Sequence, residues 1–215
     1  MRTVLLALAM LLAPLAPASA AIGIDEAVVA YESGDFAKAR IAFTRLARKG
    51  IPAAEYNLAV MHLRGELPKP NPREALRLMR LSAEAGFVTG IYGLGQMYEL
   101  GQGGLRIDLV EANRWYLRAA EAGSVAAQVA IGTAHYLGRG AQKDAALAAR
   151  WFRIAAQGGD VGAMYLYASM VESGDGIPRD LTEARYWYGV AARNGDEAAP
   201  SKVKELDAKL GAPAT

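Results

Sequence analysis

The chain has 215 residues, a formal net charge of +2 and no cysteine. The absence of cysteine excludes a disulfide framework and a thiolate metal site. Acidic and basic residues are interspersed along the chain, so we expect binding neither to nucleic acid nor to an anionic membrane.

The first twenty residues have the pattern of a secretory signal peptide. Arg2 provides a positive start, residues 4–15 form an apolar run, and residues 18–20 (Ala-Ser-Ala) offer a cleavage site. The run is too short for a membrane span. We therefore expect the mature chain to begin at Ala21 without membrane insertion, in the periplasm or, alternatively, secreted. A retained signal anchor is the other interpretation of the same residues.

Three tryptophans, Trp115, Trp151 and Trp187, are spaced 36 residues apart in the similar contexts ANRWYLRAAEAG, AARWFRIAAQGG and ARYWYGVAARNG. A fourth copy, ALRLMRLSAEAG, has Leu78 at the tryptophan position. A fixed period of this size is typical of stacked helical hairpins, because one hairpin cannot bury its own apolar face. Counting from the glycine before each hairpin gives unit 1 (50–85), unit 2 (86–122), unit 3 (123–158) and unit 4 (159–194).

Each unit carries the same helix-ending and helix-starting residues. A glycine ends the first helix, where a left-handed residue without Cβ is favoured. An Asp or Asn closes the following loop, where its side chain can cap the second helix. The predicted C-caps are Gly65, Gly101, Gly138 and Gly174, and the predicted N-caps are Asn71, Asp108, Asp144 and Asp180.

These residues resemble the Sel1-like repeat, a relative of the tetratricopeptide repeat. Unit 2 shows the pattern most fully, with Gly90, Leu94, Gly95, Tyr98, Gly101, Gly103, Asp108, Ala112, Trp115, Tyr116, Ala119 and Ala120. The resemblance covers residues 50–195 and implies an all-α, right-handed α-solenoid of helical hairpins. Unit 1 departs from the pattern with Leu78-Met79 in place of Trp-Tyr and three prolines in its loop, so the shape of that loop stays open.

The two ends differ from the repeats. The short turn after Gly34 is similar to that of a tetratricopeptide unit, and a capping helix is expected from Glu197 to Leu210, with Val203 and Leu206 in its apolar stripe together with Leu210. The predicted organisation is a signal peptide (1–20), a tetratricopeptide-like hairpin (21–49), four Sel1-like repeats (50–194), and a capping helix with a frayed tail (195–215).

No motif for catalysis, phosphate binding or a cofactor is present, so we predict no enzymatic activity, no cofactor and no metal site. His62 and His135 stand where unit 2 has Tyr98, and we interpret them as half-buried structural residues. Some cysteine-rich Sel1-like proteins are reported to bind or slowly hydrolyse β-lactams. Weak β-lactam interaction is therefore an alternative that the resemblance raises, although those repeats are closed by disulfides that this chain lacks.

Helical periodicity divides the first helix of each unit into two faces. Positions four, eight and eleven after the leading glycine share one face, which we assign to the core: Ala54, Leu58, Met61, Gly90, Leu94, Met97, Ala127, Ile131, Ala134, Ala163, Tyr167 and Met170. We also assign the three tryptophans and the aromatic residue after each one to the core between repeats.

The opposite face carries positions six, ten and thirteen, which include four tyrosines and no Lys or Arg. In tetratricopeptide-like superhelices the first helices line a concave groove, so the resemblance implies that this face points into it. Tyrosine is enriched where surfaces recognise partners. The predicted partner-binding residues are Tyr56, Tyr92, Gln96, Glu99, Thr133, Tyr136, Tyr165, Ser169 and Glu172. Packing of these side chains within a tightly curved superhelix is the other interpretation.

The resemblance implies a scaffold, adaptor or regulator in the bacterial envelope. We expect a monomer that binds a protein or peptide segment in the groove. Recognition of peptidoglycan fragments by the tyrosines is the alternative in which the ligand is small.

Overall fold

The computed structural model describes residues 18–211, with side chains from residue 23, and every regular element in this range is helical. The predicted signal peptide lies outside the described residues up to residue 17. The helices are α1 (Ala18–Glu32), α2 (Phe36–Ala47), α3 (Pro52–Arg64), α4 (Pro72–Glu84), α5 (Val88–Leu100), α6 (Leu109–Glu121), α7 (Val125–Leu137), α8 (Ala145–Gln157), α9 (Val161–Ser173), α10 (Leu181–Arg193) and α11 (Ala199–Leu210), with a short 3₁₀ turn, η1 (Gln102–Gly104).

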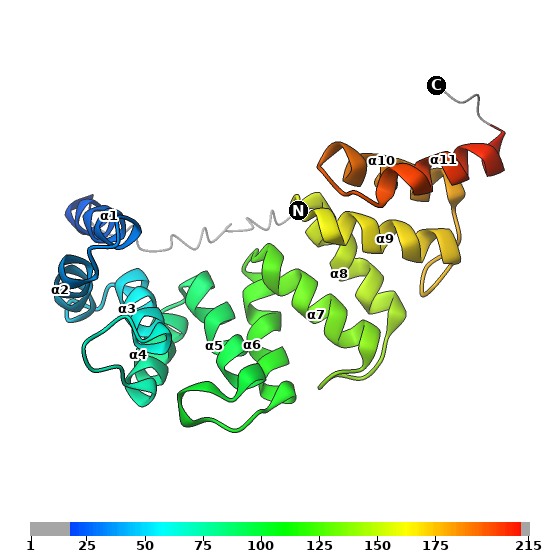
Figure 1. Ribbon diagram of the computed structural model, residues 1–215. Coiled ribbons are helices and arrows are strands. Elements are labelled where there is room, and N and C mark those ends of the chain that lie inside the picture. Colours follow the sequence, from blue (N-terminus) through cyan, green and yellow to red (C-terminus); the bar gives the residue numbers. More distant parts are fainter. Residues whose placement is uncertain (1–17, 212–215) are drawn as a thin grey trace, which may run out of the picture.

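The helices form hairpins that stack along an open arc from α1 to α11 (Figure 1). Units 1 to 4 contain α3/α4, α5/α6, α7/α8 and α9/α10, preceded by α1/α2 and followed by α11. Each helix packs mainly on its neighbours in the chain, both within a hairpin and from one hairpin to the next. This arrangement is the predicted all-α, right-handed solenoid.

The predicted helix ends are confirmed. Gly65, Gly101, Gly138 and Gly174 all adopt the left-handed conformation at the C-caps of the first helices. The side chains of the four predicted N-caps accept hydrogen bonds from backbone N–H groups in the first turn of the second helices. The backbone ends of these helices are thus satisfied locally, which fixes the length of each hairpin.

The second loop glycine holds each loop against the preceding unit. Gly140 lies over Leu109 at the start of α6, and Gly176 lies over Ala145 at the start of α8. An added Cβ would come within 2.5 and 2.3 Å of backbone carbon atoms there, and both residues have positive φ, 65° and 71°. In unit 1 the equivalent residue is Leu67, which is buried and lines a cavity beside Phe36 of α2. A side chain therefore replaces the close backbone approach in this loop.

The predicted core face of the first helices is confirmed, because all twelve residues assigned to it are buried. The aromatic pairs assigned to the core all pack on it, but the two members of each pair are buried to different extents. Tyr116, Phe152 and Tyr188 are buried, whereas Trp115, Trp151 and Trp187 are half-buried. Adjacent residues of a helix point about 100° apart, so both cannot face the centre of the hairpin. The tryptophans instead cover its edge.

The capping helix begins two residues later than predicted. The Asp196 carboxylate accepts hydrogen bonds from the N–H groups of Ala198 and Ala199, which delays the first regular turn. Within α11, Leu206 is fully buried, whereas Leu210 is exposed, because it lies in the last turn beyond the contact with α10. The apolar stripe is therefore shorter than the sequence predicts.

Candidate partner-binding groove

The predicted groove residues differ in exposure. Gln96 and Tyr136 are exposed, and Tyr136 has an exposed fraction of 37%. The remaining seven residues are half-buried: Tyr56, Tyr92, Glu99, Thr133, Tyr165, Ser169 and Glu172. The structure agrees in part with both interpretations of this face, because its side chains pack on the solenoid and also keep contact with solvent.

The half-buried tyrosines pack one side of the ring on another aromatic ring. Tyr92 lies 5.3 Å from Tyr116, and Tyr165 lies 5.0 Å from Tyr188, measured between ring centroids. Both partners come from the second helix of the same unit. Tyr56 packs instead on Phe87, at the start of unit 2, with centroids 5.8 Å apart. Such tilted pairs hold the ring orientation beyond what burial alone provides.

Units 2 and 4 contain the same three-residue arrangement, which we call the Tyr-Tyr-Glu cluster. In unit 2 the Tyr116 hydroxyl donates to the Glu99 carboxylate at 2.6 Å. In unit 4 the Tyr188 hydroxyl donates to the Glu172 carboxylate at 2.9 Å. Burial, followed by the hydrogen bond to the neighbouring glutamate, raises the pKa of both tyrosines, so each hydroxyl remains a donor.

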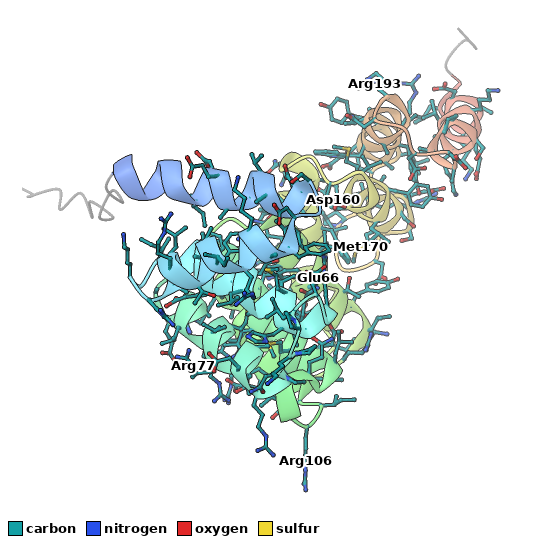
Figure 2. All side chains as sticks on the ribbon, turned by 60° about the vertical axis from the view of Figure 1, so that its left-hand side comes forward. Glu66, Arg77, Arg106, Asp160, Met170 and Arg193 are labelled. Carbon is teal, nitrogen blue, oxygen red and sulfur yellow. The ribbon has the colours of Figure 1, made fainter. Side chains whose placement is uncertain are left out.

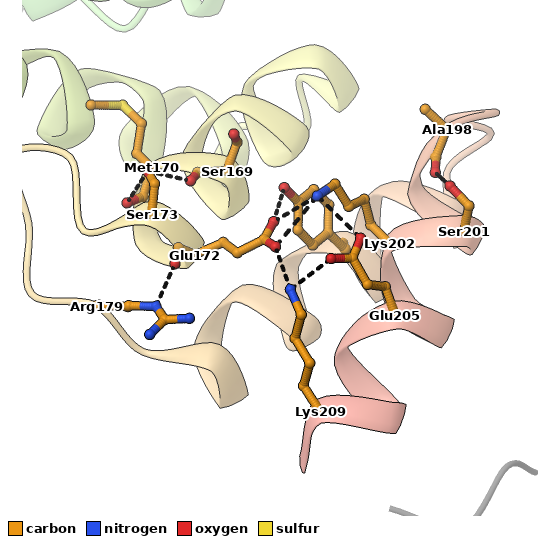
Figure 3. A network of polar contacts seen from close by, with 11 residues as sticks. Ser169, Met170, Glu172, Ser173, Arg179, Ala198, Ser201, Lys202, Glu205 and Lys209 are labelled. Carbon is orange, nitrogen blue, oxygen red and sulfur yellow. Dashed lines mark hydrogen bonds and ion pairs between the residues drawn. The ribbon is translucent and has the colours of Figure 1, made fainter. Parts of the chain in front are cut away.

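Each glutamate of these clusters also meets a cation from the next element along the solenoid. Arg139 lies 3.8 Å from Glu99, and Lys202 of α11 lies 3.1 Å from Glu172. Figure 3 shows Glu172 at the centre of the second network, where Lys209 also approaches. Burial alone would raise the pKa of Glu172, but the hydrogen bonds from Lys202 and Tyr188 outweigh it and lower that pKa. The glutamates thus connect adjacent hairpins.

Unit 3 has no such cluster. Its Tyr136 stands where units 2 and 4 have Glu99 and Glu172, so the glutamate is missing. The Tyr136 ring packs edge-on against Phe152, with ring centroids 6.5 Å apart. A cavity of about 130 Å³ lies between units 2 and 3 and is lined by both polar and apolar groups. Its lining residues are Glu99, Leu109, Ala112, Asn113, Tyr116, Ala130, Thr133, Ala134 and Arg139.

The histidines confirm the structural interpretation. Both are half-buried, and Nδ1 of His62 accepts a hydrogen bond from the N–H of Asn71 at 3.2 Å. Nδ1 of His135 lies 3.1 Å from the carbonyl oxygen of Gln142. Each ring therefore fastens the loop of its own unit.

Among residues 18–211, no group of three or more acidic or histidine side chains is placed to hold a metal ion. None of the described helices is both long enough and apolar enough to cross a bilayer.

The sequence did not identify four contributors to this face. Tyr116 and Tyr188 were assigned only to the core, although their hydroxyls reach the predicted glutamates. Arg139 stands two residues after a helix in a glycine-rich loop, and Lys202 is in the capping helix. The sequence shows interspersed acidic and basic residues. Which of them form ion pairs between consecutive hairpins depends on the geometry of the superhelix.

Comparisons with known proteins agree with this architecture. The Sel1 repeat model matches residues 52–87, 88–124, 125–160 and 161–196. The crystal structure of c5321, a protective antigen of uropathogenic Escherichia coli strains displaying an SLR fold, is 30% identical with a TM-score of 0.82. A Sel1 repeat protein from Oxalobacter formigenes is 34% identical with a TM-score of 0.74. A putative Sel1 repeat protein from Klebsiella pneumoniae, 22% identical with a TM-score of 0.54, shares the fold and covers 88% of this chain and 96% of its own.

The first two relatives are longer than the part matched here. The alignments cover 93% and 79% of this chain but only 43% and 49% of those proteins. No curated protein matches the chain. Four consecutive family matches nevertheless span well over half of it, and both longer relatives are similar to it in sequence and in fold. The chain belongs to the Sel1 repeat family, whose members generally mediate protein–protein interactions.

Proposed function

We propose that this chain is a non-enzymatic adaptor or regulator of the bacterial envelope that binds a peptide or protein segment in the groove of its first helices. The observation that supports this proposal most is the row of half-buried tyrosines on a face without Lys or Arg at the predicted positions. A helix face that is turned away from the core and merely solvated would carry charged residues.

The Tyr-Tyr-Glu clusters support binding because they prepare the tyrosine rings in advance. Tyr92 and Tyr165 are held by a second ring, which is itself fixed by a glutamate. A partner that packs on the free side of such a ring orders few additional side chains, so less conformational entropy is lost on binding. Gln96 and Thr133 stand at position ten of their units, between positions six and thirteen of the same helix face. Their side chains can form hydrogen bonds with the backbone of an extended peptide.

The size of the cavity between units 2 and 3 favours a segment over a small organic ligand. Its volume of about 130 Å³ is below the range of about 300–1,000 Å³ that is usual for drug-sized ligands. It is suited to one side chain of a longer chain. The polar groups of Glu99, Asn113 and Arg139 would then determine which side chain is accepted.

The place of action and the assembly are part of the same proposal. The signal-peptide pattern of residues 1–20 supports export to the periplasm, with secretion as the alternative. We propose that the mature protein acts as a monomer without cofactor, metal, nucleic acid or membrane insertion. The solved relatives with at least 30% identity are bacterial proteins, which agrees with this setting.

The test is affinity capture from an envelope fraction with the mature chain as bait, repeated with the variant Tyr92→Ala/Tyr165→Ala. We expect the captured partner to be lost. Because these changes also remove ring packing, Gln96→Lys provides a second variant on an exposed residue of the same face. Tyr186→Ala is the matched control, since Tyr186 is 59% exposed on a second helix, outside the predicted groove.

Unchanged capture by both groove variants would contradict the proposal, provided that thermal melting shows each variant to be folded. The alternatives have their own assays. A melting temperature raised by muropeptides and lost in the tyrosine variant would favour peptidoglycan recognition. Hydrolysis of nitrocefin above background would favour the β-lactam alternative instead.

A further inference from the structure

Unit 1 differs from the other units at two buried positions that meet in one cavity. Five residues after the leading glycine it has the acidic residue Glu55, where units 2, 3 and 4 have the uncharged residues Ile91, Gln128 and Met164. Seven residues after the N-cap it has Leu78, where the other units have tryptophan. Both residues line a cavity of about 400 Å³ enclosed by α2, α3 and α4.

Glu55 is a largely buried carboxylic acid that the nearby charge of Arg77 attracts without a hydrogen bond. Its exposed fraction is 6%, and no residue in the described part of the chain donates a hydrogen bond to its carboxylate. The nearby Arg77 is occupied, because it donates two hydrogen bonds to Glu74 at 2.9 and 2.7 Å. Burying a carboxylate without a partner costs free energy. A group that reaches Glu55 from outside the protein would recover part of that cost.

The missing tryptophan explains why there is space. In unit 4, Trp187 packs edge-on against Tyr167 with ring centroids 5.6 Å apart. The unit 1 equivalents are the smaller Leu78 and Leu58, and both line the cavity. Leu58 also lines an adjoining cavity of about 490 Å³ that runs toward Leu67 and Pro68. The space therefore continues along the loop of unit 1.

The charges around Glu55 come from every helix that encloses it. Arg48 follows α2 as its C-cap, Glu55 lies on α3, and the Glu74–Arg77 pair lies on α4. Arg40, His62 and Lys69 line the adjoining cavity. Arg77 forms its hydrogen bonds with Glu74 and acts on Glu55 only through its charge, so the carboxylate of Glu55 can still accept hydrogen bonds from a ligand. Figure 2 shows Arg77 at the outer edge of the helix stack. Arg48 can donate to a carbonyl group of a bound peptide.

The apolar walls and the single available carboxylate suit a cation on a long apolar stem. We propose that this cavity binds the side chain of a lysine presented by a partner peptide, with the ammonium at Glu55 and the methylene groups between Leu58 and Leu78. A charge-assisted hydrogen bond would then satisfy the carboxylate, and the stem would fill the place of the absent indole. The site lies on different residues from the tyrosine groove, so it does not rest on the function proposed above.

The test uses two probes with the same four-carbon side chain, of which only the first carries an ammonium group: Nα-acetyl-lysine methylamide and Nα-acetyl-norleucine methylamide. Binding is followed by amide NMR shifts of the mature chain. Since one side chain makes few contacts, we expect a dissociation constant on the order of 1–10 mM for lysine. We expect binding of norleucine to be weaker by about tenfold or more, because it lacks the ammonium.

Three variants decide the assignment. Glu55→Ile and Leu78→Trp introduce residues that other units carry at these positions, and Glu55→Gln removes only the charge. We expect all three to abolish saturable shifts with the lysine probe. Glu84→Gln on the exposed side of α4 is the matched control and should bind as the unmodified chain does.

Circular dichroism melting establishes whether each variant is folded. If the bulkier Leu78→Trp variant is not folded, Glu55→Gln alone tests the assignment. Equal affinity for the two probes, the absence of saturable shifts in the unmodified chain, or unchanged binding by Glu55→Gln would each overturn the proposal.

Discussion

Units 1 and 4 are built from helices of identical length, 13 residues each, with an αL glycine after the first helix and a capping Asn or Asp before the second. They nevertheless differ at three positions that face neighbouring elements. The pairs are Glu55 and Met164, Leu67 and Gly176, and Leu78 and Trp187. In unit 1, Glu55 and Leu78 line a cavity of about 400 Å³, and Leu67 lines an adjoining one. In unit 4 the cavity lined by Gly176 is smaller, about 290 Å³, and has no carboxylate.

This difference shows that backbone ends and side-chain packing are separable in the repeat. The caps satisfy backbone groups within each hairpin, so a hairpin forms whichever residues stand at the three exchangeable positions. Those positions influence how much space is left between the hairpins. A repeat can thus acquire a binding site without changing its fold.

The largest effect is expected from Gly176→Ala in unit 4. The new Cβ would lie 2.3 Å from the backbone carbon of Ala145, and φ is 71°. Overpacking against backbone and a left-handed alanine each cost free energy, so we expect the free energy of unfolding to fall by about 3 kcal/mol. Urea unfolding followed by circular dichroism measures this change.

Gly159→Ala is the matched control for this variant. Gly159 has a similar positive φ, 94°, but an added Cβ meets no atom within 4 Å. We expect a loss of about 1 kcal/mol from backbone strain alone. Equal losses for the two variants would show that the close approach of the unit 4 loop does not contribute to stability.

Trp187→Leu converts the edge of unit 4 to that of unit 1. The change removes the indole that packs on Tyr167, and we expect a loss of about 2 kcal/mol, because the indole is only half-buried. The reverse change, Leu78→Trp, should leave stability equal or increased, since a cavity is available. Thermal unfolding compares the two, and a strong destabilisation by Leu78→Trp would contradict equivalence of the positions.

Much of this architecture was predictable from sequence because its signals are local. Cap residues and helical periodicity act within one unit, and the four copies identified them, so Gly101 and Asp108 were placed correctly. The division between Trp115 and Tyr116 was not predictable from the pattern, since adjacent aromatic residues look equally suited to a core. The pairings of Glu99 with Arg139 and of Glu172 with Lys202 depend on how consecutive hairpins are rotated, which no single repeat encodes.

An acid-dependent difference is expected at unit 4. Glu172 has a lowered pKa because hydrogen bonds from Lys202 and Tyr188 outweigh the effect of burial. Its contribution is therefore present above the ordinary value of 4.5 and is lost as the pH falls through the lower folded-state pKa. We expect Glu172→Gln to lower the free energy of unfolding by about 1.5 kcal/mol at pH 7.

The difference between this variant and the unmodified chain should shrink as the pH falls below 4.5 and Glu172 becomes protonated. No such pH-dependent contribution is expected from unit 1, because the uncharged Leu63 stands at the position equivalent to Glu172. Urea unfolding at a series of pH values measures the difference. A loss that does not depend on pH would show that shape rather than charge is the contribution of Glu172.

The smallest effect, and one of opposite sign, is expected from Glu55→Ile in unit 1. Burial raises the pKa of Glu55, and the attraction of Arg77 only partly offsets it. The folded chain thus binds the proton more tightly than the unfolded chain, so Glu55 becomes increasingly destabilising as the pH rises from 4.5 through the raised pKa. We expect Glu55→Ile to increase the free energy of unfolding by about 1 kcal/mol at pH 7, with a smaller gain below pH 4.5.

The pH dependence separates two causes of this gain. A better-filled cavity would stabilise Glu55→Ile equally at every pH, whereas removal of a desolvated charge gives a gain that grows with pH. Glu55→Gln isolates the second cause, because it keeps the shape of the side chain. If Glu55→Gln does not increase the free energy of unfolding at pH 7, the buried carboxylate does not destabilise the free protein. A cation bound in the cavity of unit 1 would then have no desolvation cost to offset.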